Sequence, residues 1–202
     1  MFVQVIQGKV SDGAEARAAV DRWTEELAPG ATGWLGSTGG VTEDGRLIAL
    51  VRFESPEAAR ANSERVEQDQ WWAQTAKLFT GEPTFHDSDV VDIDTPGNPA
   101  DARFVQVMQG RSSDPARARE LMSQVDPADW AAFRPDVLGT MTVSHGDGYT
   151  MAIYFTSEAD ARAGEQKEPP EAIKEMMGRM DALSVGEPEF FDLREPWLHA
   201  PH

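Results

Sequence analysis

Residues 2–8 (FVQVIQG) are rich in aromatic and β-branched residues, with Gln side chains that interrupt the apolar pattern, which predicts a β-strand. Nearly the same strand occurs again at residues 104–110 (FVQVMQG), an offset of 104 − 2 = 102 residues. After each strand, apolar side chains recur every three or four residues, which is the spacing of one helix face. These apolar stripes comprise Ala16, Val20, Trp23 and Leu27 in the first copy, and Ala118, Leu121, Met122 and Val125 in the second. The chain is therefore predicted to contain two copies of one module.

Each copy continues with a β-hairpin, a second helix and a last strand. Asp-Gly at residues 44–45 and 147–148 suits the positive φ of a tight hairpin turn. The second helical region starts at Ser55 and at Ser157, because serine is a favourable N-cap residue. Gly-Glu-Pro then precedes the final strand, expected over residues 84–93 in the first copy and 189–193 in the second. The order β-α-β-β-α-β predicts an α+β fold of two ferredoxin-like repeats.

The predicted boundaries are residues 1–93 for the first repeat, 94–102 for a linker, 103–193 for the second repeat and 194–202 for a partly loose C-terminal tail. A period of 102 residues is too long for a solenoid, whose units span about 20 to 50 residues. Since helices cover only one face of each antiparallel sheet, we expect the two sheets to face each other, as in a dimer fused into one chain. The expected assembly is this fused pseudo-dimer as a monomer, or a weak homodimer.

Charge and cysteine content narrow the classes of partner. The formal net charge of −17 and the sequence pI of about 4.5 would repel nucleic-acid phosphates and anionic membranes, so neither is an expected partner. The lack of cysteine excludes disulfides, thiolate nucleophiles and cysteine-ligated metals. The N-terminus runs directly into a strand pattern without a basic segment or an apolar run, so we expect a cytoplasmic protein.

Several short motifs recur at matching positions of the two copies. Phe-x-Ser leads into the second helix at residues 53–55 and 155–157, Ala-Arg follows at 59–60 and 161–162, and Gly-Glu-Pro leads into the last strand. With the Phe-Val-Gln-Val strand, these motifs make residues 2–193 resemble the dimeric α/β-barrel superfamily, in particular antibiotic-biosynthesis-monooxygenase-like proteins, with both protomers on one chain. Members of the superfamily include cofactor-free monooxygenases of aromatic polyketides, haem-degrading enzymes and proteins without assigned activity. Fold alone does not choose among these functions.

The resemblance also implies site residues. The quinone-forming monooxygenases of this group carry an Asn and a Trp four residues apart on the second helix. Asn62 matches the Asn, but Val66 stands at the Trp position, and Trp71 and Trp72 follow later. The haem-degrading relatives carry a proximal His further along this helix, where the present chain has Gly-Glu at residues 81–82. A haem ligand is therefore not visible, and neither a cofactor nor a metal is expected.

The first copy is the expected location of a ligand pocket. Asn62, Trp71 and Trp72 have no counterparts in the second copy, which reads Glu-Gln-Lys-Glu at residues 165–168 and Met-Met at 176–177. In one interpretation, Asn62 hydrogen-bonds a flat substrate and the Trp rings stack on it. In the other, the two Trp rings are core residues that pack beneath and beside the helix.

Gln4 and Gln106 occupy the same position of the two repeated strands. These amides are predicted either to point into an apolar cavity and orient a carbonyl or hydroxyl ligand, or to hydrogen-bond each other across the pseudo-twofold axis. His86 is the histidine nearest to a predicted cavity wall and is a further candidate. The histidines are too scattered in sequence to indicate a metal site: His86, His145, His199 and His202.

These features together predict an oxidoreductase that acts on a hydrophobic aromatic small molecule in the barrel cavity, as a cofactor-independent monooxygenase or a related enzyme. The substrate phenol would be deprotonated, and pocket donors would stabilise the anion while it reacts directly with oxygen. The predicted catalytic residues are Asn62, Trp72 and His86, and the predicted substrate-binding residues are Gln4, Gln106 and Trp71. Two alternatives stay open, a non-catalytic small-molecule-binding or stress-associated module and a haem-binding or haem-degrading protein.

Overall fold

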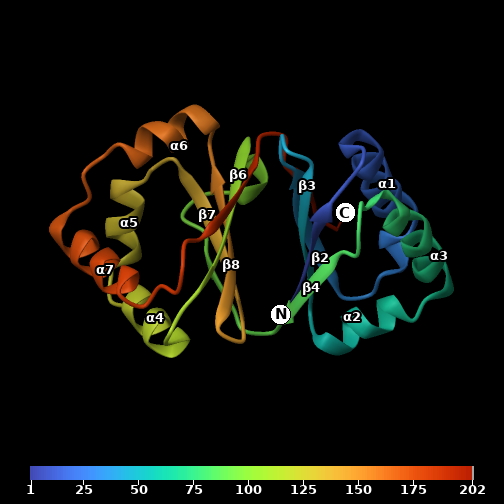
Figure 1. The fold of residues 1–202 in the computed structure, drawn as a ribbon, viewed down its shortest axis with the longest axis horizontal. Helices are drawn as coiled ribbons and strands as arrows, with labels where there is room; N and C mark the ends of the chain where they lie inside the picture. The colour runs from blue at the N-terminus through green and yellow to red at the C-terminus, as the bar shows by residue number, and fades with distance from the viewer. Residues whose placement is uncertain (202) are drawn as a thin grey trace. The chain divides into compact units, whose positions relative to one another are not determined.

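The computed structural model describes residues 1–201 and divides into two compact units (Figure 1). The first unit contains Met1–Val91 together with the C-terminal segment from Glu195 onward, and the second contains Asp92–Arg194. The residues predicted to form a linker, 94–102, therefore belong to the second unit. The segment predicted to form a tail belongs, from Glu195, to the first unit.

The first unit consists of one five-stranded antiparallel sheet with its α-helices on one face (Figure 1). The strand order is β10-β2-β3-β1-β4. The strands are β1 (Phe2–Lys9), β2 (Trp34–Val41), β3 (Arg46–Phe53), β4 (Thr84–Ser88) and β10 (Trp197–His199). The helices are α1 (Gly13–Glu26), α2 (Pro56–Ser63) and α3 (Val66–Thr75), with short 3₁₀ turns at Ala28–Gly30 and Ala76–Leu78. Asp12 caps α1 and Ser55 caps α2, each by accepting hydrogen bonds from backbone N–H groups of the first turn.

The second unit repeats this plan with the strand order β5-β7-β8-β6-β9. Its strands are β5 (Val91–Asp94), β6 (Phe104–Arg111), β7 (Val137–His145), β8 (Gly148–Phe155) and β9 (Glu189–Leu193). Its helices are α4 (Pro115–Met122), α5 (Pro127–Phe133), α6 (Glu158–Glu165) and α7 (Glu171–Asp181), with a 3₁₀ turn at Pro99–Asp101. These helices also lie on one face of their sheet (Figure 1). Asp114 caps α4, since its carboxylate accepts a hydrogen bond from Arg117 N.

Equivalent hydrogen bonds identify the two units as copies of one fold. Ser11 N donates to Leu78 O at 2.9 Å in the first unit, and Ser113 N donates to Leu183 O at 2.8 Å in the second. The antiparallel pairing of β1 with β3 recurs as that of β6 with β8. The predicted α+β fold of two ferredoxin-like repeats is therefore confirmed. The two acceptor residues, Leu78 and Leu183, follow the second helical regions of their repeats, so these regions align at an offset of 183 − 78 = 105 residues.

Each sheet is completed by a strand from outside its own repeat. The strand predicted over residues 84–93 breaks after Ser88, whose hydroxyl accepts a hydrogen bond from Val90 N (3.0 Å) and so turns the chain. The continuation, β5, joins the second sheet beside β7. The expectation of a loose tail was wrong from Trp197 to His199, because these residues form β10 on the edge of the first sheet. Three residues are too few to show a strand periodicity in the sequence.

A glycine on β2 makes room for β10. Gly36 has a φ of +124°, and the register between β2 and β3 shifts at this point. A Cβ atom added to Gly36 would lie 2.5 Å from His199 O and 2.5 Å from Arg52 Nη2. Both the backbone angle and the close approach of β10 therefore require glycine here.

We expect Gly36→Ala to displace β10 and to lower the free energy of unfolding of the first unit by about 2–4 kcal/mol, from backbone strain and overpacking together. Urea unfolding followed by tryptophan fluorescence would measure this loss. The signal comes mainly from the first unit, because Trp130 is the one tryptophan of six in the second. Gly81→Ala is the matched control, since Gly81 has a φ of +138° but no atom within 4 Å of an added Cβ. Equal losses in the two variants would contradict the docking role of Gly36.

Candidate functional site

A cavity of about 250 Å³ lies within the first unit, between its sheet and helices α1 and α3. The cavity separates two hydrophobic clusters of the core, because side chains of both clusters line it. One cluster contains Trp23, Trp34 and Phe53, and the other contains Val10, Leu47 and Trp197. The cavity is thus a gap in an otherwise apolar core, the environment in which most small-molecule sites are found.

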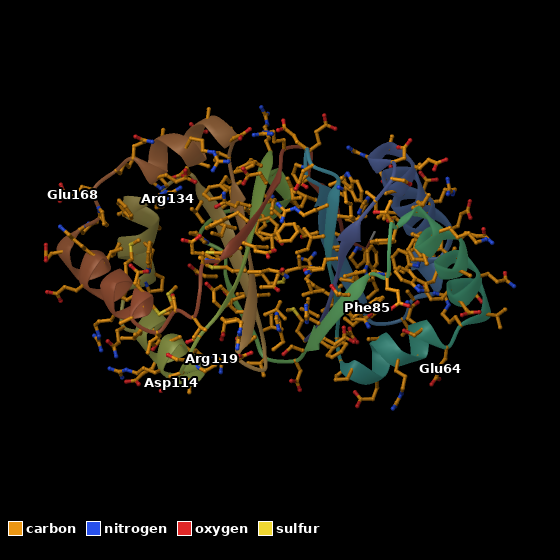
Figure 2. All side chains as sticks on the ribbon, viewed as in Figure 1. Glu64, Phe85, Asp114, Arg119, Arg134 and Glu168 are labelled. Atoms are coloured by element: carbon orange, nitrogen blue, oxygen red, sulfur yellow. The ribbon has the colours of Figure 1, made fainter. Side chains whose placement is uncertain are left out.

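Aromatic rings form one wall of the cavity. The Trp71 ring lies 6.3 Å from that of Trp23 and 6.1 Å from that of Trp72, and the Trp72 ring lies 5.6 Å from that of Phe85. Trp23 is held in place because its Nε1 donates to Gln68 Oε1 at 2.6 Å. Phe85, on β4 and labelled in Figure 2, is 48% exposed, so the row of rings runs from the core to the surface. These ring faces and edges suit contact with a flat apolar ligand.

Asn62 supplies a polar group to the cavity from the last turn of α2. It is 7% exposed, and its Oδ1 accepts a hydrogen bond from Arg65 Nη1 at 3.0 Å. The same Arg65 nitrogen donates to Leu27 O, also at 3.0 Å, so the guanidinium is anchored. Because a guanidinium can only donate, Arg65 fixes which end of the amide is oxygen. Within residues 1–201, Asn62 Nδ2 is left as a donor without a protein partner.

His199 supplies a second polar group, from β10. Its Nε2 lies 3.2 Å from Asp21 Oδ1 on α1, and its Nδ1 is buried without a hydrogen-bond partner in the described part of the chain. His199 and Trp197 both line the cavity, since alternate residues of a strand share a face. In the sequence, His199 falls in the segment predicted to be a partly loose tail, residues 194–202. No sequence signal marks it, because a three-residue strand is too short to show a periodicity.

The structure brings together most of the first-copy residues that the sequence singles out. Gln4, Asn62, Trp71 and Trp72 all line the one cavity. His86 follows Phe85 on β4 and so points to the opposite face of the sheet, and it is not among the lining residues. The assignment of both Trp rings to the core alone is too simple, because each is only partly buried and contacts the cavity.

The two matching glutamines make equivalent hydrogen bonds within their own sheets. Gln4 Nε2 donates to Asp87 Oδ2 at 3.2 Å, and Gln106 Nε2 donates to Asp192 Oδ1 at 2.8 Å. Each aspartate lies directly opposite its glutamine in the strand register. Gln106 belongs to the second unit, and Arg162 also pairs with its partner Asp192. The Gln–Asp pair between neighbouring strands is thus a feature of both repeats. Of the two glutamines, Gln4 is the one that also lines the cavity of the first unit.

The second unit fills the equivalent place with apolar side chains. At the offset of 105 residues, Gln68 corresponds to Ile173, and Trp71 corresponds to Met176. Ile173 is fully buried, and it packs with Met176 in a cluster with Leu121. A separate hollow of about 290 Å³ lies between α5 and α7 of this unit. The polar groups that face the cavity of the first unit are therefore not repeated at these positions.

The histidines do not come together in one site. His86 lies on β4, His145 lies on β7 with its Nε2 3.1 Å from Thr150 Oγ1, and His199 lies on β10. His202 lies outside the described residues. Within residues 1–201, no group of three or more His, Asp or Glu side chains is placed to hold a metal ion. No helix in that range is both long enough and apolar enough to cross a membrane.

The arrangement of elements matches several solved structures over nearly the whole chain. A proposed monooxygenase from Fusobacterium nucleatum aligns with a TM-score of 0.76 and 10% identity, covering 98% of this chain and 94% of its own. A proposed monooxygenase from Lactobacillus acidophilus aligns with a TM-score of 0.71 and 12% identity, covering 98% of both chains. An anthrone oxidase-like protein aligns with a TM-score of 0.69 and 13% identity, covering 100% of this chain and 91% of its own. This chain shares their fold.

The comparisons by sequence give no match. No protein-family model matches the chain, and no curated protein matches it. At 10–13% identity, the structural likeness carries the fold and not the activity. The resemblance to antibiotic-biosynthesis-monooxygenase-like proteins, expected from the repeated motifs, is therefore confirmed for the fold.

Proposed function

We propose that the first unit binds a flat, hydrophobic aromatic molecule in its cavity and oxygenates it with molecular oxygen, as a cofactor-independent monooxygenase. One observation carries this proposal, namely a cavity in an apolar core that combines a wall of Trp rings with the unpartnered amide donor of Asn62. Asn62 Nδ2 keeps some contact with solvent, so a ligand with an acceptor oxygen would take the place of water at this donor. The fold shared with proposed monooxygenases agrees with this function but does not establish it.

The size and shape of the cavity limit the ligand. An apolar cavity of about 150 Å³ holds benzene, so a cavity of about 250 Å³ suits a ligand of about two or three fused rings. The rings of Trp23 and Trp71 are fixed by their Nε1 hydrogen bonds, the second of which goes to Ala19 O at 3.0 Å. A preformed slot of this kind favours rigid planar ligands, because little conformational entropy is lost when they bind.

The reaction proposed is the conversion of an activated CH₂ or CH group of a phenolic substrate to a carbonyl. For an anthrone-like substrate, the CH₂ carbon gains one oxygen atom, and the other oxygen atom leaves as water with the two hydrogens. Asn62 Nδ2 would stabilise negative charge on the substrate oxygen, as a donor that is already in place. Trp71 and Trp72 would hold the ring plane, Gln4 would contribute to the polar floor, and the apolar walls would exclude water.

We expect Asn62→Asp to reduce turnover by about 10²-fold, the usual cost of losing one donor to a developing oxyanion. In this variant, Oδ1 can still accept the hydrogen bond from Arg65, and only the NH₂ donor is replaced, by a second oxygen. The side chain therefore stays held by Arg65. Oxygen uptake with a panel of quinols and anthrones would measure turnover. Gln166→Glu, at the end of α6, is a control for the added charge in the second unit.

The same panel tests the proposed function itself. Uptake by the native chain no faster than that of a protein-free solution would refute the monooxygenase proposal. Quenching of tryptophan fluorescence by the same compounds would then favour the non-catalytic binding module, because four of the six tryptophans line the cavity. Equal uptake by Asn62→Asp and the native chain would remove Asn62 from the mechanism.

A further inference from the structure

We propose that His199, oriented by Asp21, is the base that takes a hydroxyl proton from the ligand in this cavity, an inference that rests on the proposed function. His199 lies opposite Ser37 in the pairing of β10 with β2, and both residues line the cavity. Its side chain is 17% exposed. The base is thus delivered by a strand that comes from outside the first repeat.

The hydrogen bond to Asp21 decides which nitrogen of His199 can accept a proton. A carboxylate only accepts hydrogen bonds, so the nitrogen that faces it, Nε2, carries the hydrogen in the neutral ring. The lone pair is then on Nδ1, the buried nitrogen without a partner. A histidine base whose second nitrogen is hydrogen-bonded to a carboxylate is a common arrangement in acid–base catalysis. Nδ1 is closed to a water-sized probe, so a shift of the imidazole or of its neighbours must bring this nitrogen to the ligand. The geometry therefore leaves a base nitrogen without a protein partner, in a residue that lines the cavity.

The charged groups around His199 come from three elements and from the segment just before β10. Asp21 and Arg17 lie on α1, and Arg17 also pairs with Glu195 at 3.7 Å. Arg52, on β3, and the backbone oxygen of His199 both lie 2.5 Å from the Cβ position of Gly36. Asp69 lines the cavity from α3. Among these groups, Asp21 is the one in hydrogen-bond contact with the imidazole, and its negative charge would stabilise the imidazolium that forms.

Donor and acceptor groups enter the cavity from different elements of the unit. Arg65 ties Asn62 to Leu27, a member of the cluster with Trp23, whereas His199 is two residues from Trp197 in the other cluster. A ligand that spans the gap and carries a hydroxyl group at one end and an acceptor oxygen at the other would satisfy both groups. The inferred ligand class is therefore a hydroxylated aromatic carbonyl compound, such as a hydroxyanthrone.

The proposed step is a proton transfer without any redox change. The O–H bond of the ligand breaks, an N–H bond forms at His199 Nδ1, and the electron pair stays on the ligand oxygen. The products are an imidazolium hydrogen-bonded to Asp21 and a phenolate in an apolar cavity. The proton can later return to reduced oxygen as water leaves, so the base is regenerated in each cycle.

The step can be tested without turnover by using 4-nitro-1-naphthol in the absence of oxygen. The absorbance of this probe distinguishes the neutral naphthol from the naphtholate. At one pH unit below its pKa, about one tenth of the free probe is ionised. We expect more than half of the probe bound to the native chain to be naphtholate, and we expect His199→Gln to return the fraction to about one tenth. His86→Gln is the matched control, since it removes a histidine from the same sheet but outside the cavity lining.

The outcomes separate this inference from the proposed function. Neutral probe bound to the native chain, or naphtholate bound to His199→Gln, would overturn the assignment of the base. Naphtholate formation by the native chain, lost in His199→Gln, together with no oxygen uptake in the quinol panel would support the base and refute the monooxygenase. Oxygen uptake without naphtholate formation would support the monooxygenase and overturn the assignment of His199 as the base.

A second variant covers the case in which His199→Gln fails to fold. Asp21→Asn leaves β10 and its pairing with β2 unchanged, because Asp21 lies on α1. We expect an intermediate naphtholate fraction, since the neutral amide supports the imidazolium less well than a carboxylate. A fraction equal to that of the native chain would overturn the positioning role of Asp21.

Discussion

Trp197→Ala is expected to lower the free energy of unfolding of the first unit by about 3–5 kcal/mol, the usual cost of truncating a buried tryptophan. Trp197 is 6% exposed and packs with Val10, Ala16 and Leu47. It is the largest side chain of a three-residue strand, so most of the burial that holds β10 in place depends on it. Urea unfolding, read by circular dichroism, would measure the loss.

The same variant should also open the cavity at its β10 end. We therefore expect weaker binding of the naphthol probe, measured by its absorbance change on titration with protein. Trp197→Phe is the control, because it keeps an aromatic ring in the cluster and should cost less than half as much. A loss below about 1 kcal/mol for Trp197→Ala would mean that β10 contributes little to the stability of the first unit.

Arg134→Met is expected to destabilise the second unit by about 3–5 kcal/mol, because it leaves a buried carboxylate without its partner. Arg134 makes a two-pronged contact with Asp136, Nε to Oδ1 at 3.0 Å and Nη2 to Oδ2 at 2.7 Å, and it also donates to Ala161 O. The side chains are 16% and 7% exposed. Arg134 is the C-cap residue of α5 and lies between α5 and α6 in Figure 2, and its hydrogen bond to Ala161 O connects the two helices. Urea unfolding followed by far-ultraviolet circular dichroism would measure the loss.

Two further variants test the cause of this effect. Arg117→Met breaks an exposed pair with Glu120 on α4, and we expect it to cost less than about 1 kcal/mol. The double variant Arg134→Met with Asp136→Leu removes both charges, and we expect it to recover most of the lost stability, since a buried pair replaced by apolar side chains is often neutral. A double variant as unstable as Arg134→Met would assign the loss to packing against Phe155, whose ring lies 5.5 Å from the guanidinium.

Local signals explain how much of the fold could be predicted. The repeated strands, the Asp-Gly turn at residues 44–45 and the caps at Ser55 and Ser157 each specify structure within a few residues of themselves, and all of them are present. The second hairpin turns one residue earlier than predicted, because Gly146 has the positive φ of +62° and Gly148 already belongs to β8. The two edge strands could not be predicted in the same way. β5 depends on the side-chain turn at Ser88, and β10 depends on a pairing with β2 that joins residues more than 150 positions apart. Pairing at that distance leaves no periodic trace in either segment.

The candidate site likewise contains residues that could be found from the sequence and residues that could not. Trp71, Trp72 and Asn62 could be found from the sequence because they occur in the first copy and have no counterparts in the second. The structure places all three at one cavity. His199 could not, since its partner Asp21 is 178 residues away. His86 illustrates a different limit. A shift of one residue in a strand exchanges its two faces, and Phe85, not His86, faces the cavity.

A ribosome completes the second unit before it makes β10, because Asp92–Arg194 stand between β4 and β10 in the chain. Throughout that interval, the first unit has all its helices and four of its strands, but β2 presents an unpaired edge. An open edge of this kind is a site at which growing chains pair wrongly with one another. Arrival of β10 would close the edge and add the last wall of the cavity in one event. Ligand binding by the first unit should therefore begin only when synthesis has passed His199.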